Sequence, residues 1–96
     1  MRIRFHAAAE KETEEVADYY DHQLPGLGAE FYHELGAIMD LLELNPRMDV
    51  VYSGPYRRVL MQRFPFAVYY EVADNQIRIM AVAHQRRMPE YWKGRE

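Results

Sequence analysis

The side chains best suited to chemistry gather near the carboxyl end of the chain. His84 is followed closely by Arg86 and Arg87. A neutral imidazole can act as a general base, and guanidinium groups favour negative charge developing beside it. The alternative is a histidine at a strand end that only hydrogen-bonds the segment after it. The spacing leaves both interpretations open.

Three further arginines and two aromatic residues could bind a ligand. Arg57, Arg58 and Arg63 are compatible with a phosphate-binding stripe, in which strand alternation would put Arg57 and Arg63 on one side. A solvated edge that pairs with an acidic partner protein is the alternative. Tyr91 and Trp92 could stack on bases or anchor a protein interface, or Trp92 could instead pin the last segment to the sheet.

Metal and cofactor sites have little support. Glu30, His33 and Glu34 have an E-x-x-H spacing, but such sites need a matching second helix, and the first helix offers only His22 near its end. The chain has no cysteine, which excludes disulfides, thiolate metal sites and cysteine nucleophiles. We therefore expect no metal and no cofactor.

Composition and charge narrow the class of protein. The 96 residues are enough for one core, so we expect a single domain over residues 1–96. No apolar run reaches the ~20 residues of a membrane span, and the first residues do not resemble a secretory signal. We expect a cytoplasmic protein with no membrane contact. The overall pI of about 5.8 disfavours non-specific nucleic-acid binding.

The two halves of the chain carry opposite net charge. Residues 1–48 hold four Lys/Arg and ten Asp/Glu, whereas residues 49–96 hold eight and five. Any surface that faces a polyanion should therefore lie in the second half.

Two helices are predicted in the first half. Apolar residues recur at three- and four-residue spacing over Ala7–Leu24, and again from Leu27 onwards. Pro25-Gly26 separates the two segments, and Asn45-Pro46 ends the second. The short link predicts an antiparallel helical hairpin.

The second half has the period of two that is typical of strands. With Ile3–Phe5 at the start, the predicted strands are Val50–Tyr52, Arg57–Arg63, Phe66–Val72 and Gln76–His84. One face should carry the following apolar residues: Phe66, Val68, Tyr70, Val72, Ile77, Ile79, Ala81 and Ala83. The other face, with Tyr69, Arg78, Met80 and Val82, is expected to be partly covered or used for binding. We predict an α+β fold, in which the hairpin packs on a mainly antiparallel, twisted sheet of four to five strands.

The order of elements and several local motifs resemble the RelE/ParE superfamily of type II toxin–antitoxin toxins, over essentially the whole chain. The ParE-like, plasmid-stabilisation branch is similar in these segments: Tyr19-Tyr20, Pro25-Gly26-Leu27-Gly28 with Phe31, Asn45-Pro46, Arg57-Arg58, Phe64-Pro65-Phe66 to Tyr70, His84-Gln85-Arg86-Arg87, and Pro89 with Tyr91-Trp92.

The resemblance implies one of two activities. One branch of the superfamily cleaves messenger RNA on the ribosome, which needs cations around the phosphate and an acid/base pair. The other branch poisons DNA gyrase and needs no catalytic residues of its own. The ribonuclease branch has an arginine where this chain has Ala67, and its second arginine aligns near Gln85, or with Arg86 after a one-residue slip.

The candidate site residues follow from this comparison. For RNA cleavage the catalytic set would be His84, Arg87, Tyr91 and Arg58. For target or antitoxin binding it would be Arg57, Arg63, Arg86 and Trp92. The departure at Ala67 favours the non-enzymatic, gyrase-directed branch over the ribosome-dependent endoribonuclease.

The resemblance also implies protein partners. These are a cognate antitoxin, whose flexible tail covers the sheet and the basic groove, and either DNA gyrase or the ribosome with its mRNA. A heterotetramer or larger assembly with the antitoxin is compatible with this view. A further alternative is a degenerate member that keeps antitoxin binding and has lost toxicity.

Overall fold

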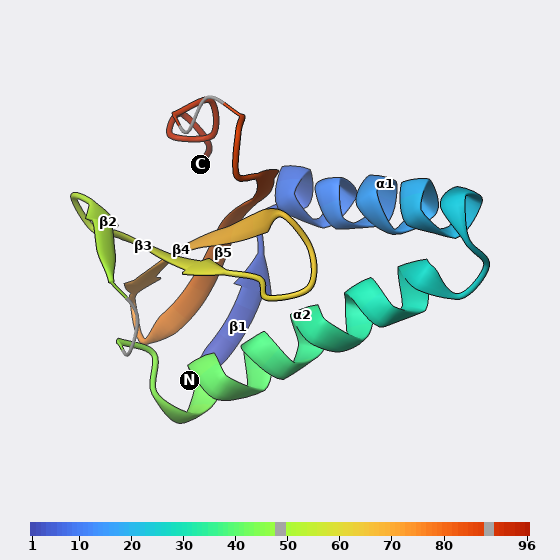
Figure 1. Cartoon of the computed structure of the whole chain (residues 1–96). Coiled ribbons are helices and arrows are strands. Elements are labelled where there is room, and N and C mark those ends of the chain that lie inside the picture. The colour runs from blue at the N-terminus through green and yellow to red at the C-terminus, as the bar shows by residue number, and fades with distance from the viewer. Residues whose placement is uncertain (48–49, 88–89) are drawn as a thin grey trace.

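Two helices lie on one face of a five-stranded sheet in the computed structural model, which describes residues 1–47, 50–87 and 90–96 (Figure 1). Pro89 of the family pattern lies outside the described residues. The elements are β1 (Arg2–Phe5), α1 (Ala7–Gln23), α2 (Leu27–Leu44), β2 (Val51–Ser53), β3 (Tyr56–Leu60), β4 (Phe66–Ala73) and β5 (Gln76–His84). The predicted α+β class is confirmed.

The turn between the helices is fixed by one carboxylate. Gly26 has a φ of 92°, a left-handed conformation that glycine adopts without strain. Asp21 of α1 accepts hydrogen bonds from the main-chain N–H groups of Gly26 (3.2 Å) and Gly28 (2.8 Å) at the start of α2. An anionic acceptor at a helix N-terminus stabilises it, so α1 provides the cap that the sequence of α2 lacks.

The two helices approach most closely at Gly28. A Cβ atom at this position would lie 2.5 Å from the Ala17 carbonyl oxygen and 2.9 Å from the Asp21 carboxylate. The Ala17 oxygen is part of the α1 backbone, so it can move away only if the two helices separate.

Gly28→Ala is therefore expected to lower the free energy of unfolding by about 2 kcal/mol, because the helices must separate. Gly36→Ala is the control, because nothing lies within 4 Å of a Cβ there and the change should stabilise α2 by about 1 kcal/mol. Urea denaturation of both variants measures the difference. Equal effects of the two changes would contradict the close approach.

The strand order is β1-β5-β4-β3-β2, with β1 parallel to β5 and all other pairs antiparallel. The face under the helices carries the main core. Its fully or nearly buried members include Phe31, Leu35, Leu42, Val68, Tyr70, Ile77, Ile79 and Val82.

A β-bulge in β5 corrects the predicted face assignment. Tyr69 pairs with Ala81 and Tyr70 pairs with Ile79, so Met80 is an extra residue in the ladder. After Met80, each side chain of β5 points to the face opposite the one that strict alternation predicts. The prediction that Ala81 and Ala83 share a face with Ile77 and Ile79 is wrong, as is the placement of Val82 on the opposite face.

The predicted strand Arg57–Arg63 is also too long. β3 ends at Leu60, after which the main-chain N–H groups of Gln62 and Arg63 donate to the Glu34 carboxylate of α2. These donors are satisfied by a helix side chain in place of a strand partner. The connection to β4 therefore folds towards the helices.

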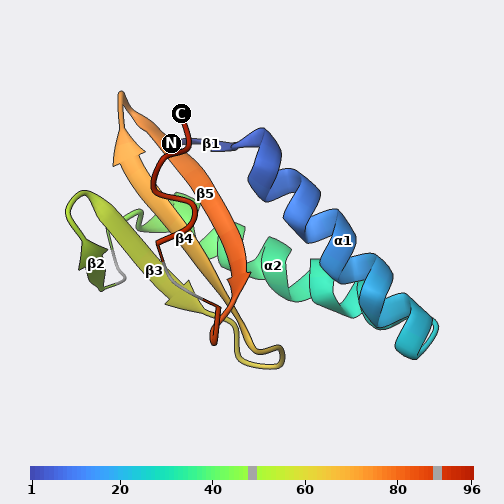
Figure 2. The same ribbon diagram turned by 90° about the horizontal axis from the view of Figure 1, so that it is seen from above.

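The face away from the helices is covered by the last residues of the chain, which is one of the two alternatives predicted for it. Figure 2 shows this segment running across the sheet on the side opposite α2. Trp92 is fully buried there and forms a second apolar cluster with Ala67, Tyr69, Met80, Ala81 and Ala83. The sheet thus has a core on each face.

Candidate functional site

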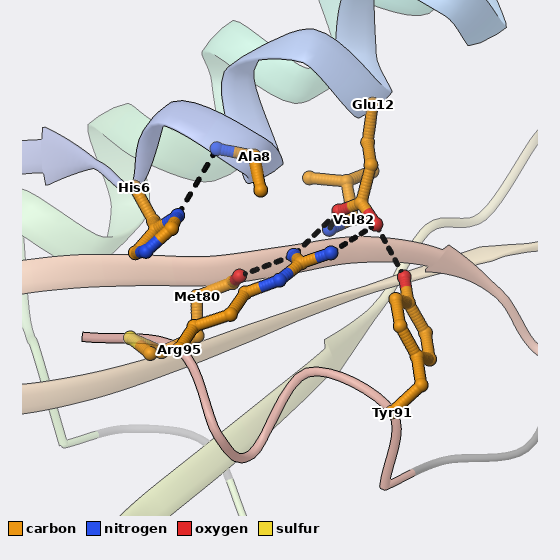
Figure 3. A network of polar contacts seen from close by, with 7 residues as sticks. All are labelled: His6, Ala8, Glu12, Met80, Val82, Tyr91 and Arg95. Atoms are coloured by element: carbon orange, nitrogen blue, oxygen red, sulfur yellow. Dashed lines mark hydrogen bonds and ion pairs between the residues drawn. The ribbon is translucent and has the colours of Figure 1, made fainter.

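A partly buried polar network ties the C-terminal segment to α1 and β5 (Figure 3). Glu12 accepts hydrogen bonds from both guanidinium nitrogens of Arg95, at 3.1 and 2.9 Å. The same carboxylate accepts the Tyr91 hydroxyl and the main-chain N–H of Val82 (3.0 Å). Arg95 also donates to the Met80 carbonyl at 2.8 Å. The side chains of Arg95 and Glu12 are only 17% and 16% exposed.

This network replaces a missing strand neighbour. β1 ends at Phe5, and the His6 N–H donates to the Ile79 carbonyl as the last contact of that ladder. The next groups on this edge of β5, the Met80 carbonyl and the Val82 N–H, would otherwise be unpaired. Because buried main-chain groups need partners, Arg95 and Glu12 complete the edge with side chains.

The network also sets the protonation state of Tyr91. Burial raises the pKa of the Tyr91 phenol above its ordinary value of 10.0, and the hydrogen bond to Glu12 raises it further. Arg87 and Arg95 oppose this effect only in part. The pKa of Arg95 is raised as well, first by its hydrogen bonds to Glu12. Tyr91 is therefore held as a neutral donor and is poorly suited to accept a proton.

The raised pKa of Tyr91 predicts a loss of stability at alkaline pH. In the unfolded chain Tyr91 ionises near its ordinary value, whereas in the folded chain it stays protonated. Its contribution is thus complete below about pH 10 and declines as the pH rises further. Urea denaturation from about pH 9 to pH 11 should show this decline, and Tyr91→Phe should remove part of it. An identical pH profile in the variant would contradict the shift.

His84 lies apart from the Tyr91 side of the sheet. Its ring contacts the ring of Phe66 at a centroid distance of 5.4 Å, and Phe66 packs against the core under the helices. Its Nδ1 accepts the main-chain N–H of Arg86 at 3.1 Å. This is the hydrogen-bonding role given above as the alternative to a general base.

The arginines after β5 take different positions. The Arg87 guanidinium lies 3.7 Å from the centre of the Tyr91 ring, which is a cation–π contact. Arg86 is exposed, and the structure gives its side chain no partner among the described residues. Within the described residues, Arg87 and Tyr91 are the only members of the predicted catalytic set whose side chains contact each other, and His84 meets Arg87 only through a main-chain hydrogen bond of 3.0 Å.

Arg57 and Arg58 point to opposite faces of β3. Arg58 is exposed and lies 5.0 Å from the ring centre of Tyr52, which packs on the Trp92 cluster. Arg57 donates to the Arg47 carbonyl at 3.2 Å, beyond the end of α2. The two neighbouring cations therefore do not form one binding surface.

Arg63 is turned towards α2, where it forms an ion pair with Glu30. Arg57, Arg58 and Arg63 thus occupy three separate environments and do not form the phosphate stripe considered above. Glu30 and Glu34, from the E-x-x-H spacing, are engaged by Arg63 and by the main chain before β4. The described residues contain no group of three or more metal-binding side chains.

Two predicted positions are buried. Trp92 has no exposed surface. The centre of its ring lies 4.9 Å from the ring centre of Tyr69 and 4.8 Å from the ring centre of Tyr56. Ala67 is also fully buried, in the same cluster. The structure favours the interpretation in which Trp92 pins the last segment to the sheet.

Sequence reasoning missed Glu12 and Arg95. Glu12 is one of six acidic residues of α1 and no sequence pattern distinguishes it from the other five, and Arg95 is one of several cations in the last segment. A weak signal existed, because Glu12 is adjacent in sequence to Thr13, which lies on the buried face of α1.

Within the described part of the chain, no helix is both long and apolar enough to cross a bilayer.

Comparisons with known proteins agree with the geometry. The model of the family described as "ParE toxin of type II toxin-antitoxin system, parDE" matches residues 3–89. Among solved structures, a chain titled "Chromosomal ParDE TA system from P. aeruginosa" has a TM-score of 0.77 and 15% identity. The match covers 88% of this chain and 95% of that chain, and at this identity it shows the fold alone. No curated protein sequence matches the chain.

Proposed function

Because the chain belongs to the ParE toxin family of type II toxin–antitoxin systems, we propose that it poisons DNA gyrase and that a cognate antitoxin neutralises it. Gyrase acts on the bacterial chromosome, so the proposed site of action is the cytoplasm. The activity would require binding alone, without a catalytic residue in this chain.

The separation of His84 from Tyr91 is the observation that favours gyrase inhibition over RNA cleavage. Cleavage by a 2′-hydroxyl needs an acid and a base within hydrogen-bond reach of the same phosphate. Here His84 lies against Phe66 on the helix side, whereas Tyr91 packs on the opposite face. The Tyr91 hydroxyl is moreover bound to Glu12, and Ala67 provides no cation. These facts argue against a shared reaction centre.

Exposed cations of the second half are the proposed contacts for the target. Arg86 is exposed beyond the end of β5, and Arg58 is exposed on the face that carries Tyr52. Arginine beside an aromatic ring is common in protein hot spots. Arg57 and Arg63, which are tied to the helix side, fit an antitoxin contact better than a gyrase contact.

A pair of assays tests the proposal. The purified protein is expected to inhibit supercoiling by gyrase and to trap double-strand DNA breaks. In a translating extract, primer extension on the message should show no codon-phased cuts. Arg86→Ala should weaken gyrase inhibition by at least about tenfold if Arg86 is a hot spot.

Three other outcomes discriminate the alternatives. Codon-phased cuts that disappear in Arg87→Ala would replace the proposal with the ribosome-dependent endoribonuclease. Inactivity in both assays, with tight antitoxin binding, would indicate a degenerate member. Light scattering of the toxin–antitoxin complex would show whether it is a heterotetramer or a larger assembly.

A further inference from the structure

An aromatic ring holds the guanidinium of Arg87, which is an exposed residue. The Arg87 Cζ atom lies 3.7 Å from the centre of the Tyr91 ring. This is the contact distance of two stacked planes, so the guanidinium lies flat on the ring. Arg86, the neighbouring exposed cation, has no such contact among the described residues. A side chain that is already ordered loses less conformational entropy when it binds a partner.

The Tyr91 ring is itself held at its hydroxyl end. The hydroxyl donates to a Glu12 carboxylate oxygen, and the ring packs on the Trp92 cluster (Figure 3). Glu12 is fixed in turn by both guanidinium nitrogens of Arg95. A residue of α1 therefore determines where the ring under Arg87 lies.

The acidic residues near Arg87 are engaged elsewhere. Glu12 pairs with Arg95 at 2.9 Å. Glu90 pairs with Lys93 at 3.2 Å, and Arg87 has no ion pair among the described residues. A guanidinium stacked on a ring keeps its N–H donors at its edge, where two of them can bind the two oxygens of one anionic group. Arg87 thus presents an unpaired bidentate donor at the surface.

A protein carboxylate is the oxyanion that suits this donor best. It accepts two parallel hydrogen bonds from a guanidinium, and arginine and tyrosine are both enriched in protein hot spots. A phosphate has a similar geometry. However, the net charge of −3 and the pI of about 5.8 disfavour the approach of this chain to a DNA backbone.

We propose that Arg87, held flat on the Tyr91 ring, binds a carboxylate on the surface of gyrase, and that Glu12 is a positioning residue that acts through Tyr91. Since gyrase is taken as the target, this contact rests on the proposed function. The chemical group recognised on gyrase is thereby specified, and the network behind Tyr91 acquires a role in binding as well as in stability.

Binding to purified gyrase without DNA tests the contact. Arg87→Ala is expected to weaken the affinity of the full chain by at least about tenfold. Arg87→Lys should lose nearly as much, because an ammonium group keeps the charge but lacks the planar fork. Arg2→Ala is the matched control and should leave the affinity unchanged, because Arg2 is exposed on β1 and has no partner among the described residues.

A double-mutant cycle tests the positioning role. Tyr91→Leu removes the ring, so the Arg87 side chain must be ordered on binding and the affinity should fall by about threefold to tenfold. In an Arg87→Ala background the same change should have almost no effect. A purely structural role of Tyr91 would instead lower the affinity equally in both backgrounds.

NMR provides a signature that a change in stability alone would not produce. The ring current of Tyr91 should shift the δ-methylene protons of Arg87 upfield. The shift should vanish in Tyr91→Leu and shrink in Tyr91→Phe, in which the ring remains but has lost its hydrogen bond to Glu12. Urea denaturation shows which variants are folded. If Tyr91→Leu does not fold, Tyr91→Phe and Arg87→Lys still decide the outcome.

Several results would overturn the proposal. Unchanged affinity in Arg87→Ala, or full affinity in Arg87→Lys, would refute recognition by the guanidinium fork. A loss in Arg87→Ala that is seen only when DNA is present would assign the contact to a DNA phosphate. Additive losses in the cycle, or the absence of an upfield shift, would refute the positioning role.

The target and the contact can fail separately. A chain that neither binds nor inhibits gyrase refutes the target, and the ring-current shift of Arg87 still decides whether Tyr91 holds its guanidinium. A chain that poisons gyrase while Arg87→Ala keeps full affinity refutes only the contact.

Discussion

Replacing Trp92 with alanine is expected to lower the free energy of unfolding by about 4 kcal/mol, which is a large share of the total for a domain of this size. Trp92 is fully buried and is the largest side chain of the cluster that covers the sheet opposite the helices. It packs against the rings of Tyr56 and Tyr69. Its removal leaves a cavity between the last segment and β4.

The control for this prediction is Trp92→Phe. The indole Nε1 has no hydrogen-bond partner among the described residues, so phenylalanine forfeits contact area but no hydrogen bond. Its cost should be less than half that of alanine. Urea denaturation measures both, and trypsin should cut after Lys93 faster in Trp92→Ala. A loss below about 1 kcal/mol for Trp92→Ala, with unchanged cleavage, would show that the segment does not depend on the indole.

Glu12→Ala is expected to lower the free energy of unfolding by about 2 kcal/mol, because it breaks a partly buried ion pair and leaves several donors without their acceptor. The Arg95 guanidinium, the Tyr91 hydroxyl and the Val82 N–H would all lose their acceptor. Leaving a buried donor unpaired costs more than a typical hydrogen bond contributes. Thermal or urea unfolding measures the effect.

A double-mutant cycle isolates the pair. Arg95→Ala alone should also be costly, and the double variant should be much less destabilised than the sum of the single variants. Glu14→Ala is the matched control, because Glu14 is an exposed acid on the same helix and should change stability by less than about 0.5 kcal/mol. Additive effects of Glu12→Ala and Arg95→Ala would contradict a direct interaction.

Both predictions concern the same face of the ParE-family fold. Trp92 and Arg95 hold the last segment on the sheet, and Arg87 and Tyr91 are carried by that segment. Trp92 also packs against Tyr52, the ring beside Arg58, so loss of either anchor should alter this part of the surface proposed to meet gyrase.

The sequence by itself determined the elements and their order. Both helices begin and end within one residue of their predicted bounds, because Pro25-Gly26 and Asn45-Pro46 act through local backbone chemistry. The strands were visible from their period of two. The resemblance to the RelE/ParE superfamily, confirmed by the family match, rested on this order together with short motifs.

Only the tertiary structure decided which residues meet. The bulge at Met80 inverted the face of Ala81, Val82 and Ala83, because one extra residue shifts every side chain after it. Glu34 ended β3 early by satisfying donors that a longer strand would have used. Neither event has a local signature, since each depends on a partner far away in the chain.

Contacts between residues far apart in the chain also explain why the sequence did not reveal the polar network. Glu12 and Arg95 are 83 residues apart and meet because β1 stops short of Met80 and Val82, leaving main-chain groups that require partners. His84 and Tyr91 are close in sequence yet lie on opposite faces of the sheet. Local spacing fixes helices and strands through backbone geometry, whereas contacts across the sheet follow from register, bulges and unsatisfied hydrogen bonds that only the folded chain defines.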